Sequence, residues 1–248
     1  MKTVGFQSRY RVMDAFGIPI YVDITFVILL LIFVTDFHSF TFGLAAALTL
    51  AISVTLHELA HALTARAFGF RTQDITLSLL GGCASLIALP RKAWQELVTA
   101  LAGPLVSFAL ATLAYVILSL GVITNYWLFG VFRHAFWMNI MLGAFNLLPG
   151  FPMDGGRIFR SVMRAFMNRA RATFVAMWVG RAVAILLALR AVHSVFTGGS
   201  WGFVTLMIAW MIWKEGYREY RQALVEEDFS RWTQDDFNAR VSPPPYDR

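Results

Sequence analysis

The chain has 248 residues, of which 58% are hydrophobic and 15% charged. Soluble globular proteins are about 45–50% apolar, so this composition argues against an ordinary soluble domain and indicates an integral membrane protein. The net charge of +6 does not indicate a nucleic-acid-binding protein, because Lys and Arg mostly cluster between the hydrophobic segments, as topology determinants do. The single cysteine, Cys83, excludes an intramolecular disulfide and a cysteine-based zinc cluster.

Residues 1–23 look extended, with a turn-like region at 14–17. They have no signal-peptide architecture, so the first span is expected to act as its own insertion signal. A spanning helix needs roughly 20 mostly apolar residues, and the chain offers six candidate segments, of which 24–35 is short for a span. The predicted spans are 24–35, 42–70, 96–123, 127–148, 173–195 and 201–213. The expected fold class is therefore an all-α polytopic membrane protein with about six transmembrane helices.

A different pattern follows the second predicted span. Residues 75–80 alternate as a strand does, Gly81 and Gly82 suggest a turn, and 84–89 could return. This pattern predicts a small membrane-embedded β-hairpin or a re-entrant loop. Irregular backbone at membrane depth is tolerated only where it is buried in protein or lines a cavity.

The segment after the fourth span begins with Pro149-Gly-Phe-Pro152, and a polar, arginine-rich helix is expected to follow through about residue 171. From residue 214 the chain becomes charged, which predicts a membrane-embedded domain at 1–213 and a charged cytoplasmic helix with a disordered tail at 214–248. Six spans put both termini on one side, where most Lys and Arg also fall despite Arg133 and Arg190. The positive-inside rule then predicts a multi-pass protein of the cell membrane with both termini in the cytoplasm.

The sequence His57-Glu58-Leu-Ala-His61 is an HExxH motif inside an apolar segment. A helical spacing of four places both imidazoles on one face, where both can ligate one Zn²⁺, and the glutamate beside them can serve as general base. Ionisable residues inside a membrane span usually indicate function. The alternative is a pair of core histidines hydrogen-bonded to neighbouring helices.

A catalytic zinc takes three protein ligands and leaves one position open. The best candidate for the third ligand is Asp154, which follows the two prolines and precedes Gly155-Gly156-Arg157. Glycines let the backbone turn tightly there, so that the carboxylate can point sideways. The alternative role for Asp154 is to cap the helix after it, and both roles could coexist.

At this point the chain resembles the site-2 protease family of intramembrane zinc metalloproteases. Residues 57–66 are similar to the family's HExxH helix. Gly81-Gly82, followed by Ala102-Gly103-Pro104, resembles its glycine-containing loop and the segment after it. Residues 146–157 resemble its Asn-x-x-Pro…Asp-Gly motif, and the resemblance covers roughly residues 5–215. Many related proteins carry PDZ or CBS domains; none is expected in this chain, so any regulation by a soluble domain would need a membrane partner.

The resemblance implies one zinc ion per chain, with His57, His61 and Asp154 as ligands and Glu58 as base. It also implies cleavage of a transmembrane substrate in the lipid bilayer, expected to be a single-pass protein. No nucleic-acid partner is expected. It suggests that Asn146 positions the substrate, although a polar amide in an apolar span could equally link helices. Gly81 and Gly82 would lie beside an edge strand that captures unwound substrate.

Several choices stay open from the residues alone. A polytopic zinc-binding transporter or a catalytically silent scaffold of the same fold would also bury histidine and aspartate. His134 and His193 are expected to be structural or interfacial residues and not metal ligands, and Arg181 could snorkel along its helix or pair with a carboxylate.

Overall fold

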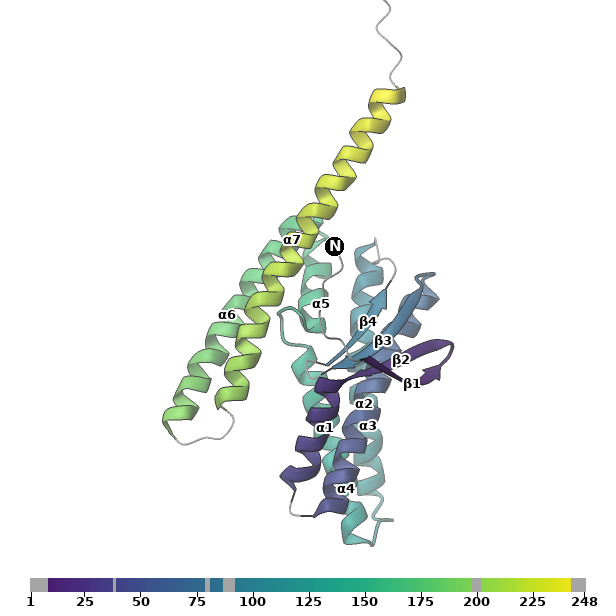
Figure 1. Ribbon diagram of the computed structural model, residues 1–248, viewed down its shortest axis with the longest axis vertical. Coiled ribbons are helices and arrows are strands. Elements are labelled where there is room, and N and C mark those ends of the chain that lie inside the picture. Colours follow the sequence, from purple (N-terminus) through teal and green to yellow (C-terminus); the bar gives the residue numbers. More distant parts are fainter. Residues whose placement is uncertain (1–8, 38, 79–80, 87–91, 198–201, 242–248) are drawn as a thin grey trace, which may run out of the picture. The chain divides into compact units, whose positions relative to one another are not determined.

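The computed structural model describes residues 9–37, 39–78, 81–86, 92–197 and 202–241. The chain divides into two compact units, Met1–Leu147 and Leu148–Arg248. The first unit combines helices with a small sheet, and the second is helical within its described residues (Figure 1).

The first unit contains four strands and four helices in its described part. In chain order these are β1 (Arg9–Ala15), β2 (Ile18–Asp23), α1 (Ile24–Asp36), α2 (Phe40–Ala67), β3 (Thr72–Ser78), β4 (Gly81–Leu86), α3 (Ala93–Ser119) and α4 (Tyr126–Asn146).

The four strands form one sheet in the order β1-β2-β3-β4. β1 and β2 are an antiparallel hairpin, whose turn has positive φ at both Phe16 and Gly17, as tight hairpin turns with the twist of the strands require. β2 and β3 run parallel, with Ile20 opposite Ile75. A parallel pair needs a crossover connection, and here α1 and α2 supply it.

The hairpin predicted over residues 75–89 is confirmed as β3 and β4, but its turn was wrongly placed. Gly81 and Gly82 open β4 and lie opposite Ser78 and Leu77 of β3. They are strand residues in the described structure, while residues 79–80 and the end of the predicted return strand at 87–89 lie outside the described residues.

Alternate strand residues hold the sheet against α2. Side chains two apart point to the same face of a strand, and the buried ones on β2 and β3 meet buried residues of α1 and α2 in one cluster. Its members are Ile18, Ile20, Phe26, Leu50, Val54, Leu59, Ala62, Ile75 and Leu77. The HExxH segment of α2 is therefore fixed against the sheet through Leu59 and Ala62.

Four helices in the described residues are long and apolar enough to cross a membrane: α2, α3, α4 and α6 (Arg169–Phe196). They match the second to fifth predicted spans. The count of six is not confirmed. α1 has 13 residues, about 20 Å at 1.5 Å per residue, which is short of the roughly 30 Å hydrocarbon core. The helix α7 (Gly202–Val241) does not qualify, because its apolar stretch ends before Lys214.

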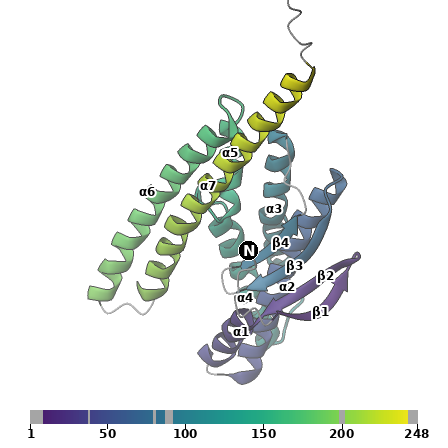
Figure 2. The same cartoon turned by 45° about the horizontal axis from the view of Figure 1, so that its top comes forward.

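In the second unit, the short helix α5 (Asp154–Met163) leads to α6 and α7, which run side by side in both views (Figures 1 and 2). The predicted arginine-rich helix is two helices, because Arg157 and Arg160 lie in α5 and Arg169 and Arg171 begin α6. α7 continues unbroken past residue 214, so no break in the helix marks the predicted domain boundary.

The membrane crossing of α1 can be tested with reporter fusions. If α1 spans with its flanking residues, reporters fused after residues 40 and 124 will be on the extracytoplasmic side and those after 92 and 168 in the cytoplasm, as the Lys and Arg asymmetry predicts. A cytoplasmic reporter after residue 225 requires in addition that the apolar start of α7 crosses back. A cytoplasmic signal from the fusion at residue 40 would show that α1 stays on the cytoplasmic side.

Candidate metal centre

Both motif histidines lie on one face of α2. His57 is buried, His61 is half-buried, and their ring centroids are 4.9 Å apart at an interplanar angle of 77°. The predicted helical spacing thus brings the two imidazoles together. Glu58, the next residue after His57, is half-buried on the same helix.

Hydrogen bonds to α3 hold the Nδ1 atoms of the two rings. His61 Nδ1 lies 2.7 Å from the backbone carbonyl oxygen of Thr99. A carbonyl can only accept, so His61 Nδ1 carries the proton and its Nε2 keeps a lone pair. His57 Nδ1 lies 2.9 Å from Ser107 Oγ. Such partners fix ring orientation in histidines that bind metals.

The two Nε2 atoms converge beside Gly103 of α3. A Cβ atom added at Gly103 would lie 2.5 Å from His57 Nε2 and closer still to His61 Nε2. The space next to both lone pairs therefore exists only because this residue is glycine. The Ala102-Gly103-Pro104 segment makes room for the imidazoles.

The residues supporting the rings were not identified as site residues from the sequence. Thr99, Gly103 and Ser107 recur at intervals of four, and this spacing puts them on one face of α3. A stripe of small and polar residues at helical spacing within an apolar span was the signal that could have found them.

Asp154 is the first residue of α5 in the second unit and is 7% exposed. The N-cap position belongs to Met153, which makes no side-chain capping hydrogen bond, so the alternative role of Asp154 as N-cap residue is not what the structure shows. The preceding loop packs closely. A Cβ at Gly156 would lie 2.7 Å from the carbonyl carbon of Gly150, so α5 can approach its own entry loop only with glycine there.

The amide of Asn146, the last residue of α4, donates from Nδ2 to the carbonyl of Leu142 one turn earlier at 2.9 Å. A link between helices is instead made by a residue that the sequence analysis did not select. Asn139 of α4 is 3% exposed, and its Nδ2 donates to Ser53 Oγ of α2 at 3.0 Å.

Two further polar residues of the spans, His134 and Arg181, contact aromatic rings. His134 contacts the rings of Phe37 and Phe42 edge-on, at centroid distances of 5.5 and 6.1 Å. The guanidinium of Arg181 lies over the rings of Trp178 and Trp213, with its Cζ 4.9 and 4.5 Å from the ring centroids. A cation–π contact of this kind satisfies a charge inside an apolar helix pair.

Replacing Gly103 by Ala tests the convergence of the two Nε2 atoms. The new methyl group would occupy the space beside both lone pairs, so we expect zinc affinity to fall by about ten- to hundredfold, the range seen when groups around metal ligands are altered. Competition with a chromophoric chelator measures it. Gly130→Ala is the control, since its Cβ would meet only the ring edge of Phe42 at 3.0 Å. Unchanged affinity in Gly103→Ala would show that a metal does not bind at this point.

Comparison with known proteins supports the resemblance noted from the motifs. The model of "Peptidase family M50" matches residues 45–126 and 119–189. A zinc metalloprotease of Methanocaldococcus jannaschii is 30% identical over 221 residues, covering 88% of this chain and 62% of that protein. A relative from Synechocystis sp. is 32% identical over 257 residues, covering 96% of this chain and 66% of its own length.

Among solved structures, the Site-2 Protease from Methanocaldococcus jannaschii matches with a TM-score of 0.65 and 28% identity, over 86% of this chain and 95% of that one. The chain spans less than two thirds of the length of the zinc metalloprotease of Methanocaldococcus jannaschii. Because the family model covers more than half of the residues and includes the HExxH helix, α3 and the Asp154 segment, this multi-pass membrane protein belongs to peptidase family M50, as its likeness to site-2 proteases indicated.

Proposed function

We propose that this protein is an intramembrane zinc metalloprotease that cleaves transmembrane segments of other membrane proteins. The observation that carries the proposal is the convergence of His57 Nε2 and His61 Nε2 beside Gly103, with Glu58 between the two histidines in the chain. Relatives that are named zinc metalloproteases support the metal and the reaction.

The donor set suits zinc. Two neutral imidazoles with fixed Nδ1 partners are typical zinc ligands, and the buried carboxylate of Asp154 is proposed as the third, giving one zinc per chain. When bound, zinc would polarise a peptide carbonyl and make a nearby water a stronger acid.

Glu58 is proposed as the general base. Its carboxylate takes a proton from the attacking water and later delivers it to the leaving amine. His61 and His57 stand six and ten residues before the end of α2 at Ala67, or about 9–15 Å along the helix axis at 1.5 Å per residue. Water therefore needs a polar path to this depth.

A transmembrane helix hides its carbonyls in its own hydrogen bonds, so the substrate has to unwind before cleavage. β4 lies at an edge of the sheet and begins with Gly81 and Gly82. An edge strand can pair with an extended chain, and we propose that β4 holds the unwound substrate, with Asn146 as a further substrate contact.

The proposed membrane topology rests on the distribution of Lys and Arg along the chain. We propose that both termini are cytoplasmic, because most Lys and Arg lie on that side. Residues 1–213 would form the membrane-embedded protease domain and 214–248 a charged cytoplasmic extension. The substrate class is a single-pass transmembrane protein, and a membrane partner could supply regulation.

Replacing Glu58 by Gln tests the function. A carboxamide cannot accept the proton, so hydrolysis of a transmembrane substrate in proteoliposomes should fall by at least about a hundredfold, while zinc content and thermal stability stay near those of the unaltered protein. Cleavage at an undiminished rate would contradict the proposed mechanism. If unaltered protein binds zinc but cleaves nothing in its own membranes, the transporter or silent-scaffold alternative is favoured.

Replacing Gly82 by Val tests the role of β4. A bulky side chain at an edge position hinders the approach of a second backbone. We expect strongly reduced cleavage of a helical transmembrane substrate, with little change in zinc content or melting temperature. Parallel loss of cleavage, zinc and stability would make this glycine a purely structural requirement of the hairpin.

A further inference from the structure

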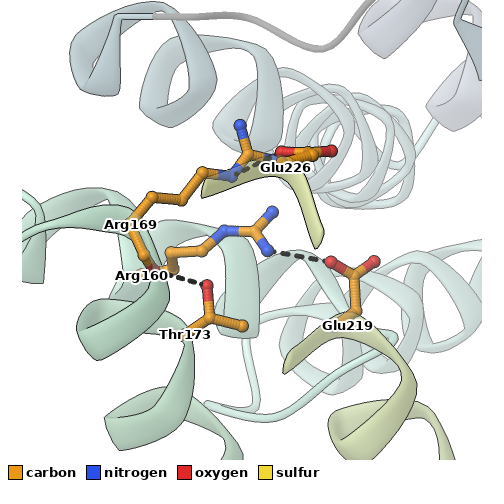
Figure 3. A network of polar contacts seen from close by, with 5 residues as sticks. All are labelled: Arg160, Arg169, Thr173, Glu219 and Glu226. Carbon is orange, nitrogen blue, oxygen red and sulfur yellow. Dashed lines mark hydrogen bonds and ion pairs between the residues drawn. The ribbon is translucent and has the colours of Figure 1, made fainter. Parts of the chain in front are cut away.

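The second unit contains a buried arginine that the proposed chemistry does not use. Arg160 of α5 is 2% exposed and is among the largest fully buried side chains in the described residues. Its Nη1 donates to Glu219 Oε2 of α7 at 2.8 Å (Figure 3). A guanidinium taken out of water requires such a partner, and the planar fork of Arg fixes its direction more tightly than a lysine would.

The flat face of the Arg160 guanidinium contacts the loop that leads to Asp154. Its Cζ lies 4.9 Å from the ring centroid of Phe151, a side chain that is 1% exposed. Phe151 stands three residues before Asp154 and Arg160 stands six residues after it. One side chain thus joins the segments on both sides of the aspartate and ties them to α7.

Two turns beyond Glu219, α7 makes similar polar contacts with the start of α6. Glu226 lies 3.3 Å from Arg169 Nε, and Glu227 Oε1 accepts a hydrogen bond from Asn168 Nδ2 at 3.0 Å. Figure 3 shows Glu219 and Glu226 both reaching toward the arginines of α5 and α6. Since Asn168 also caps α6 by accepting from Arg171 N, acidic groups of α7 hold α5 and the start of α6.

Glu219 keeps its charge in this setting. Burial opposes its ionisation, but the guanidinium groups of Arg160, Arg157 and Arg169 hold its pKa below the ordinary value. A lowered pKa means that the stabilisation is present above the pKa of the unfolded chain and is lost as the pH falls through the folded value. At neutral pH the pair is therefore fully charged.

We propose that Arg160 and Glu219 are a positioning pair that holds Asp154 in the orientation for metal binding, so that the C-terminal helix α7 supports the metal site. The proposal rests on the proposed function, in which Asp154 is a zinc ligand. It gives α7 a role beyond that of a charged extension, because the arginine that braces the Asp154 loop is held in place from α7.

The test measures zinc affinity by chelator competition and thermal stability in the same samples of full-length protein in detergent. Arg160→Gln and Glu219→Gln should each weaken zinc binding by about ten- to hundredfold at a temperature well below melting. The double variant should lose no more than Arg160→Gln alone, because Glu219 is proposed to act through Arg160. Glu215→Gln is the control, since its pair with Arg218 is local and exposed on the same helix; its zinc affinity should be unchanged.

Arg160→Lys covers the case in which a Gln variant fails to fold. The lysine keeps a positive charge opposite Glu219 but lacks the planar group over Phe151. We therefore expect a folded protein with intermediate zinc affinity. Full zinc affinity in folded variants of the pair, with only the melting temperature lowered, would overturn the proposal and leave a purely structural ion pair. Asp154→Ala is the reference that separates the two hypotheses. If it binds zinc normally, the ligand set is wrong; if it loses zinc while the pair variants do not, only the positioning role fails.

Discussion

The arrangement depends on the orientation of two imidazole rings inside an apolar helix. A histidine in such a place has two polar ring nitrogens, and leaving one unsatisfied costs about 1–3 kcal/mol. The Thr99 carbonyl and the Ser107 hydroxyl each engage an Nδ1 atom, which leaves both Nε2 atoms facing the space beside Gly103. The contacts between α2 and α3 therefore set the orientation of both rings.

The small sheet also constrains the orientation of α2. Its buried residues pack against α2 next to the HExxH motif, so the helix cannot rotate without disturbing both the apolar cluster and the two histidine hydrogen bonds. The sheet also leaves β4 at an edge. One element thus supports α2 and, under the proposed function, presents an edge to an extended chain.

The second unit holds the segment around Asp154 with both apolar and polar contacts. The loop before Asp154 is packed through Gly150 and Gly180, whose close approach leaves no room for larger side chains. Dispersion contacts fill space but constrain the orientation of a side chain only weakly. A guanidinium that has a carboxylate at its edge and an aromatic ring against its face is held in one orientation. The buried Arg160 provides such a geometry in α5, six residues after Asp154.

The sequence by itself determined what is local. Hydrophobic length located the four helices that can span, the four-residue spacing placed His57 and His61 on one face, and strand alternation predicted the hairpin that became β3 and β4. The tertiary structure alone decided what joins distant residues. It joined β2 to β3 in one sheet, brought Thr99 and Ser107 to the histidines, placed Arg181 between Trp178 and Trp213, and paired Arg160 with Glu219. Periodicity reports which face of an element a residue occupies, but the partner of that face is set by how helices and strands pack, which no local pattern encodes.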